Sequence, residues 1–215
     1  MSEGSHSAGL RLNALLAEAG LETLDNALAG CFEEYISLFI RWSERLNLTA
    51  IRDEDGILAR HFVESIACAR ALPDGIFTLL DFGSGAGFPG IPIALCRPEI
   101  TVTLAESQGK KAAFLLEAVR VLGVAAKVHS GRAEVLQDLF DCVTLRAVDK
   151  MEAAVQTAAG LVRPGGWLAL MTTTPQLEKL TKAAGAEFFW TEPVRMAGDG
   201  ARLIALGERK ISLPA

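Results

Sequence analysis

One stretch of the chain runs from a strand-like segment directly into a turn made largely of glycine. Residues 79–90 read Leu-Leu-Asp-Phe-Gly-Ser-Gly-Ala-Gly-Phe-Pro-Gly, so an apolar run and one acid precede Gly83, Gly85 and Gly87. Glycine tolerates positive φ and allows close backbone approach, and a helix after such a turn directs unpaired N–H groups at its occupant. We therefore expect these three glycines to bring backbone amides close to a ligand at the end of a buried strand.

A second strand-like run, residues 101–105, ends in Glu106, twenty-three residues after Gly83. An acid at that place can accept hydrogen bonds from both hydroxyls of a ribose. Together the turn and the acid predict a cofactor that contains a nucleoside and lies across a parallel sheet.

The spacing of the glycines separates the candidate cofactors. A dinucleotide-binding turn has a third glycine six positions into GxGxxG, where this chain has Phe88. A GxxxxGK[ST] phosphate loop is also absent from the sequence. Asp81, just before the turn, would repel a pyrophosphate but suits a cationic ligand. S-adenosyl-L-methionine carries an amino group and a sulfonium, so we expect it rather than a nicotinamide cofactor.

Length and composition predict one α/β domain with an added subdomain. The chain has 215 residues, half of them apolar, with no uncharged apolar run of membrane-spanning length and no signal-peptide pattern at its start. Its four cysteines are far apart and form no CxxC pair: Cys31, Cys68, Cys96 and Cys142. We expect reduced thiols, no metal, no membrane segment, a cytoplasmic location and a monomer.

The charge is unevenly distributed. The net charge of the chain is −5, which argues against indiscriminate coating of nucleic acid. Residues 107–132 nevertheless carry a net charge of +4, from Lys110, Lys111, Arg120, Lys127 and Arg132 against Glu117. Such a basic face can steer a polyanion. An ordinary solvated helix face is the alternative interpretation.

Apolar periodicity predicts an N-terminal helical cap (residues 1–74) and a Rossmann-like α/β domain (75–215). The cap has helical spacing over 8–20, 22–46 and 53–72. We expect seven strands, near 77–82, 101–106, 126–130, 141–145, 166–171, 186–191 and 202–207. Further helices are expected near 88–96, 109–122, 132–138, 150–162 and 175–184. This alternation implies a mostly parallel sheet, and pairing of 188–190 with 203–205 would give it an antiparallel edge.

Several further segments carry a more specific pattern. In order they are Trp42, Leu-Asn-Leu-Thr-Ala-Ile at 46–51, Arg-His-Phe-Val-Glu-Ser at 60–65, the 81–92 turn, Glu-Ser-Gln-Gly-Lys-Lys-Ala-Ala-Phe-Leu at 106–115, Gly-Arg-Ala-Glu at 131–134 and Leu-Arg-Ala at 145–147. Over roughly residues 30–210 the chain resembles the RsmG (GidB) family of class I S-adenosylmethionine-dependent methyltransferases. That family methylates guanine N7 in bacterial 16S ribosomal RNA.

The resemblance implies a set of site residues. The cofactor contacts map onto Gly83 and Phe88 in the turn, Ala133 and Glu134 after the third strand, and Arg146 after the fourth. Arg146 is the expected catalytic residue, holding the cofactor carboxylate or the target base, with a surface ion pair as the alternative. Lys110 and Lys111 are expected at RNA phosphates, and Asn47 and His61 at the RNA entrance, although both suit structural hydrogen bonding as well.

Two departures from the family pattern stand out. Glu106 replaces the usual aspartate, and residues 171–174 read Met-Thr-Thr-Thr where the family usually has Lys-Gly. The second departure keeps other functions open: a class I methyltransferase acting on a small molecule or protein, or a non-catalytic RNA-binding assembly factor. A nicotinamide dehydrogenase is the weakest alternative because of Phe88.

Overall fold

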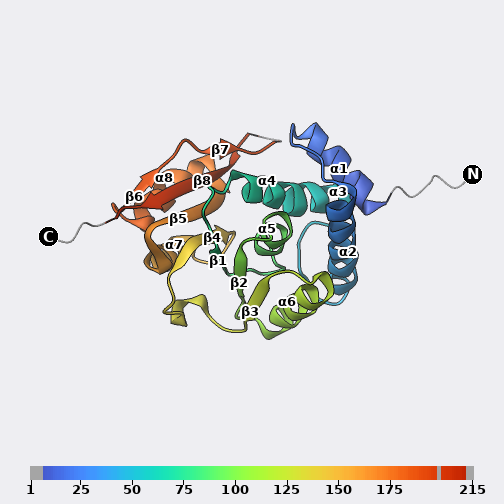
Figure 1. The fold of residues 1–215 in the computed structure, drawn as a ribbon, viewed down its shortest axis with the longest axis horizontal. Coiled ribbons are helices and arrows are strands. Elements are labelled where there is room, and N and C mark those ends of the chain that lie inside the picture. The colour runs from blue at the N-terminus through green and yellow to red at the C-terminus, as the bar shows by residue number, and fades with distance from the viewer. Residues whose placement is uncertain (1–6, 198–199, 212–215) are drawn as a thin grey trace, which may run out of the picture.

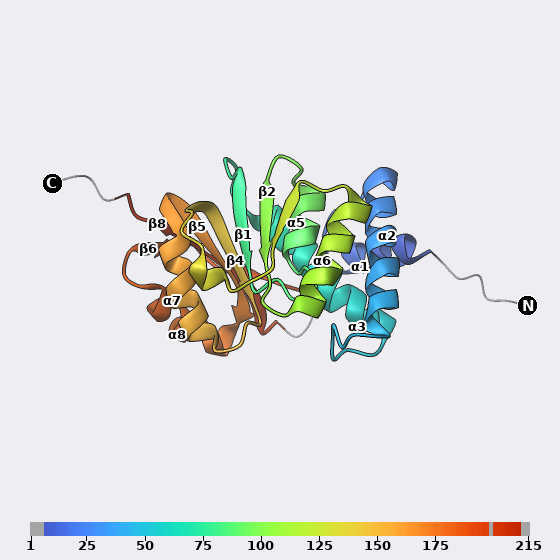
Figure 2. The ribbon, with the colours of Figure 1, turned by 90° about the horizontal axis from the view of Figure 1, so that it is seen from below.

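The computed structural model describes residues 7–197 and 200–211, and it shows one sheet with helices on both faces (Figures 1 and 2). The strands are β1 Thr78–Phe82, β2 Thr101–Ala105, β3 Ala126–His129, β4 Phe140–Arg146, β5 Val162–Thr173, β6 Phe188–Trp190, β7 Val194–Arg195 and β8 Arg202–Arg209. Their order across the sheet is β3-β2-β1-β4-β5-β8-β6, and β7 pairs with β8 off this path. The predicted α/β class with a mostly parallel sheet is confirmed.

Strands β1 to β5 pair in parallel, and the direction of the strand order changes between β1 and β4. In β1, Leu79 and Leu80 are fully buried on opposite faces, because successive side chains of a strand alternate. A strand that is buried on both faces has consecutive apolar residues in its sequence, as Leu79 and Leu80 show. The point where strand order changes is where open α/β sheets bind ligands, so β1 and β4 position the site.

The antiparallel edge differs in detail from its prediction. Phe188–Trp190 pairs with Gly207–Arg209 at the end of β8, not with residues 203–205. Leu203 and Ile204 instead pair with the two residues of β7. This short strand was not predicted, and it runs antiparallel to β8. Strand β5 also begins earlier than expected, at Val162, and a register shift against β4 lies between Phe140 and Cys142.

The helices are α1 Ala8–Glu18, α2 Asn26–Ser43, α3 Glu54–Ile57, α4 Glu64–Ala71, α5 Gly90–Cys96, α6 Gly109–Leu122, α7 Met151–Leu161 and α8 Thr174–Ala184. Figure 2 shows α5 and α6 on one side of the sheet and α7 on the other. The prediction of a helix near 132–138 is wrong, because only a 3₁₀ turn forms there, Ala133–Val135. Ala133 is the one buried residue of 132–138, so no apolar face stabilises a longer helix.

The segment expected as one helix over 53–72 contains a change of helix type. A π-helical segment, Leu58–Val63, separates α3 from α4. π-Helical turns are rare and occur frequently at functional sites. This one carries Arg60 and His61, which face the site described below.

The N-terminal helices share a core with the sheet. Phe32, Tyr35 and Phe39 of α2 are buried in one cluster with Phe62 and Phe88, and Tyr35 and Phe88 have ring centroids 5.4 Å apart. The Tyr35 hydroxyl also donates to the carbonyl of Ala86 in the glycine turn, at 2.6 Å. Helix α2 therefore supports the turn directly, and the division of the chain at residue 74 stays a prediction. Among residues 7–197 and 200–211, no helix combines the length and apolar character needed to span a bilayer.

Candidate cofactor and methyl-transfer site

A cavity of about 600 Å³ lies at the carboxyl ends of β1, β2 and β4. Five chain segments contribute most of its lining: the glycine turn after β1, residues 105–108 at the end of β2, residues 131–134 after β3, residues 146–150 at the end of β4, and Ala153, Ala154 and Thr157 of α7. His61 and Leu48 reach it from the N-terminal helical region. The cavity therefore lies where parallel strands end side by side, as the sequence predicts.

The glycine turn has the backbone conformation that its sequence requires. Gly83, Gly85 and Gly87 have φ of 73°, 59° and 86°, in the region that side chains rarely adopt. Gly83 and Gly85 line the cavity. Gly87 does not: a Cβ there would lie 2.5 Å from Ile91 and 2.8 Å from the Tyr35 hydroxyl, so this glycine permits close packing behind the turn.

Glu106 connects the turn to the next loop. One carboxylate oxygen accepts from the Gly85 amide at 2.9 Å, and the other accepts from the Gln108 amide at 2.6 Å. Each oxygen of a carboxylate has a further lone pair, so both can also accept from a ribose hydroxyl. The geometry thus fits a nucleoside with its diol at Glu106.

Asp81 does not line the cavity, and the expectation that it faces a cationic ligand is wrong. Its side chain is 1% exposed and accepts from the Gly90 amide and the Thr144 hydroxyl, each at 3.1 Å. Burial raises the pKa of Asp81 to about 6 despite these hydrogen bonds. This acid fixes the start of α5 against β1 and β4.

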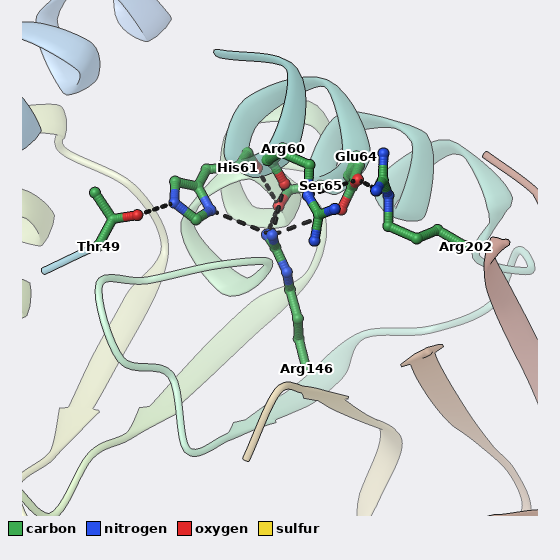
Figure 3. A network of polar contacts seen from close by, with 7 residues as sticks. All are labelled: Thr49, Arg60, His61, Glu64, Ser65, Arg146 and Arg202. Atoms are coloured by element: carbon green, nitrogen blue, oxygen red, sulfur yellow. Dashed lines mark hydrogen bonds and ion pairs between the residues drawn. The ribbon is translucent and has the colours of Figure 1, made fainter. Parts of the chain in front are cut away.

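Arg146 lies at the end of β4 in a buried network (Figure 3). Its Nη2 donates to the Arg60 carbonyl at 2.6 Å and lies 3.5 Å from a carboxylate oxygen of Glu64. Only 12% of its side chain is exposed, so the alternative of a surface ion pair is wrong. Burial is the main influence on the Arg146 guanidinium and lowers its pKa, while Glu64 acts in the opposite direction.

The tautomer of His61 follows from its neighbours. Arginine has only donors, so His61 Nδ1, 3.2 Å from Arg146 Nη2, must accept. The ring proton is then on Nε2 and is donated to the Thr49 hydroxyl at 2.7 Å. Burial, followed by the charges of Arg146 and Arg60, lowers the pKa of His61 to about 3. The ring is therefore neutral, and it stacks on Phe88 with centroids 5.0 Å apart.

The structure gathers most of the predicted site residues around one cavity. Those that line it are Gly83, Gly85, Phe88, Glu106, Ala133, Glu134, Arg146, His61 and Lys111. Lys110 and Asn47 are exposed and lie outside the lining, as does the buried Gly87. The roles of all these residues stay predictions.

Sequence reasoning did not select the loop after β4. Ala147 and Lys150 have positive φ, 50° and 52°, and residues 147–150 line the cavity. Their position directly after a central strand was the one sequence signal that could have indicated these residues. Among the described residues, no group of three or more His, Cys, Asp or Glu could hold a metal ion.

Comparison with known proteins places the chain in a family. Residues 29–197 match the model of the GidB family, described as rRNA small subunit methyltransferase G. The chain belongs to the GidB family. Two relatives named ribosomal RNA small subunit methyltransferase G are from Stenotrophomonas maltophilia K279a and Xanthomonas euvesicatoria pv. vesicatoria 85-10. The first is 41% identical over 86% of this chain and 89% of its own, and the second 39% identical over 84% and 87%.

Solved structures share the fold of this GidB family member. Cofactor-bound Rv0187 from MTB aligns with a TM-score of 0.63 and 21% identity, over 83% of this chain and 91% of its own. An O-methyltransferase from Bacillus cereus, in complex with SAH, aligns with a TM-score of 0.61 and 15% identity, over 82% and 91%. The predicted family and the class I methyltransferase fold are confirmed. The predicted cofactor, S-adenosyl-L-methionine, agrees with this family and with this fold.

Proposed function

We propose that this protein transfers a methyl group from S-adenosyl-L-methionine to N7 of a guanosine in 16S ribosomal RNA of the small subunit. The observation that carries the proposal is the cavity in which the glycine turn and Glu106 meet the buried Arg146. Membership of the GidB family supports ribosomal RNA as the substrate.

The residues of the cavity fit the cofactor. A Cβ added at Gly83 would lie 3.0 Å from Val148, so only glycine leaves this part of the turn open. Gly83 would offer backbone to the methionine part, Glu106 would accept from the ribose diol, and Ala133 with Glu134 would contact the adenine edge. Bound there, the cofactor supplies a methyl group on a positively charged sulfur.

The protein has little covalent chemistry to perform, because guanine N7 already has a free lone pair. Its task is to hold N7 in line with the methyl group and to exclude water. The polar network agrees with this: His61 Nδ1 already accepts from Arg146, so its lone pair is not available to remove a proton. Arg146 would then orient the base or the cofactor carboxylate.

Ribosomal RNA would approach over the start of α6. Lys110 is exposed on the first turn of this helix, and Lys111 beside it lines the cavity. Lysines there can contact phosphates while the target base leaves its stack. We expect the protein to act as a cytoplasmic monomer.

A class I methyltransferase acting on a small molecule or protein is the second candidate. The departure from the family pattern at residues 171–174 favours it, because the chain has no lysine there to contact RNA. Met171, Thr172 and Thr173 end β5 near the site. A non-catalytic assembly factor would bind the cofactor without transferring its methyl group.

The test is methyl transfer from radiolabelled S-adenosylmethionine to purified 16S rRNA and to small ribosomal subunits that lack the modification. We expect label in the RNA, at a single position that borohydride and aniline cleavage identifies as 7-methylguanosine. Adenosylhomocysteine should suppress the signal. Absence of label from both substrates would refute the proposal, and label in a co-purified small molecule or protein would favour the second candidate.

A further inference from the structure

A second cavity of about 290 Å³ adjoins the first. The two share Arg146, Ala147 and Val148, so the end of β4 is their common wall. The remaining lining of the second cavity comes from the end of β5, the first turn of α8, the start of α7, the π-helical segment with the start of α4, and the chain around the start of β8. A ligand in it would therefore lie next to whatever occupies the first cavity.

The apolar walls of this second cavity have an unusual composition. The chain has four methionines, and all three that follow Met1 line it: Met151, Met171 and Met196. Met171 is 6% exposed and Met196 is 7% exposed, so both thioethers are held in the wall. Methionine sulfur makes favourable contacts with aromatic rings, and its flexible chain adapts to a flat surface. This wall suits a planar aromatic ligand.

Polar groups line the same cavity. Thr172 donates to the side-chain carbonyl of Gln176 at 3.3 Å, and both residues face the cavity. Glu64 is on another side, with its carboxylate 2.6 Å from Arg202 Nε and 3.3 Å from Arg60 Nε (Figure 3). The cavity thus combines amide, hydroxyl, carboxylate and guanidinium groups. Side chains with these groups form the hydrogen bonds by which proteins recognise the edges of a base.

We infer that this second cavity binds the target guanine base after it has left the RNA stack. The inference rests on the proposed function and adds the residues that select the base. Guanine N7 and O6 share one edge, and both are acceptors. With that edge at the shared wall, N7 faces the first cavity and O6 lies beside the Arg146 guanidinium. The opposite edge, which carries N1–H and the 2-amino group, then points to groups that belong to the second cavity alone.

The walls favour a base over an RNA phosphate. The cations of the lining are Arg60, Arg146 and Arg202, and each guanidinium already lies within 3.5 Å of the Glu64 carboxylate. The three thioethers and Val148 offer no donors to a phosphate, so moving a phosphate between them would cost desolvation. A volume near 300 Å³ is at the small end of ligand pockets and suits one ring system. The segment Met171–Thr173, where the chain departs from the family pattern, forms part of this wall.

A matched pair of variants tests the assignment. Gln176→Trp adds bulk at the cavity from an exposed position of α8, whereas Gln156→Trp makes the same change at an exposed position of α7 that lines neither cavity. We expect Gln176→Trp to lower kcat/KM for ribosomal RNA at least tenfold and to leave adenosylhomocysteine affinity within twofold. Gln156→Trp should change neither. Wild-type kcat/KM in Gln176→Trp would overturn the inference.

The methionines themselves provide a direct readout. With [methyl-¹³C]methionine labelling and saturating adenosylhomocysteine, guanosine should shift the signals of Met151, Met171 and Met196 and leave Met1 unchanged. Adenosine, which lacks the O6 acceptor and the 2-amino donor, should give weaker shifts at equal concentration. Ribose 5-phosphate tests whether the cavity binds a phosphate instead of a base. If it moves these three signals and guanosine does not, the base assignment is wrong.

The two levels of the proposal fail differently. No methyl transfer by the wild-type protein to either ribosomal substrate refutes the proposed function, and the base assignment with it. Methyl transfer by the wild type together with unresponsive methionine signals, or with a fully active Gln176→Trp variant, refutes the base assignment alone.

Discussion

Arg146 Nη2 lies 3.2 Å from His61 Nδ1, and this contact joins the end of β4 to the π-helical segment of the N-terminal region. Because arginine can only donate, the contact fixes the histidine as a neutral acceptor with its proton on Nε2. Thr49 accepts that proton at 2.7 Å, so three residues from distant parts of the sequence form one chain of hydrogen bonds. The guanidinium that reaches both cavities is held by this chain.

The protonation of His61 should weaken the fold in acid. Its pKa is about 3 in the folded protein, below its ordinary value of 6.5, because burial and the charges of Arg146 and Arg60 oppose the cation. The unfolded chain then binds the extra proton between these values. The stabilising contribution is complete above pH 6.5 and is lost as the pH falls toward 3. Urea unfolding of wild type and His61→Gln should diverge over this range, with the variant losing less stability. Parallel curves would show that His61 is not held neutral in the folded protein.

Asp81 should have the opposite pH dependence. Burial raises its pKa from 3.8 to about 6, so the folded state binds the extra proton and stability falls as pH rises from about 4 to 6. Asp81→Asn keeps an acceptor for Gly90 and removes the titration. Relative to the variant, wild type should lose roughly 3 kcal/mol of unfolding free energy across that interval, at about 1.4 kcal/mol per pKa unit. A constant difference between the two proteins would show that Asp81 does not titrate there.

Gly90 should tolerate no side chain. A Cβ at this position would lie 2.3 Å from Leu104 and 2.6 Å from the Asp81 carboxylate. Gly90→Ala should therefore destabilise the protein by about 1–3 kcal/mol or more, as overpacking of a core does. Gly160→Ala, inside α7 with nothing within 4 Å of the new Cβ, is the control and should stabilise by about 0.5–1 kcal/mol. Equal effects in thermal unfolding would contradict the packing around the turn.

The two neighbouring lysines of α6 should separate RNA binding from cofactor binding. Lys110 is exposed and outside the cavity, whereas Lys111 lines it. Lys110→Ala should weaken RNA binding and reduce the slope of log K against log salt by about 0.7–0.9, the value for one phosphate contact. Its adenosylhomocysteine affinity should not change, and Lys111→Ala should lower both affinities. Lys182→Ala, at an exposed position of α8 that lines neither cavity, is the charge-matched control. An unchanged salt slope in Lys110→Ala would exclude a phosphate contact there.

The sequence predicted best those elements whose local pattern and tertiary role coincide. The strand before Gly83 and the acid after the second strand were both placed correctly, because a buried parallel strand and a positive-φ turn leave direct marks on composition. The pairing of β6 with Gly207–Arg209 was missed, since the apolar residues 203–206 of β8 form a continuous run with no alternation to specify a register. The two-residue strand β7 is too short to leave a pattern.

The candidate site was predicted as a list of residues but not as an arrangement. Asp81 was expected at the ligand, yet it binds the Gly90 amide behind the turn. Nothing local in a strand shows which neighbour a side chain will meet. The second cavity could not be found at all, because Met151, Met171 and Met196 are brought together only by the packing of α7, β5 and the segment before β8.

The most direct test of the account is calorimetric titration of the folded protein with adenosylhomocysteine. We expect one site per chain. Glu106→Gln should bind roughly ten- to a hundredfold more weakly, because hydrogen bonds to a charged group are worth about 1.5–3 kcal/mol. Folded wild-type protein that takes up neither adenosylhomocysteine nor S-adenosylmethionine would contradict the central claim that β1, β2 and β4 end at a methyl-donor site.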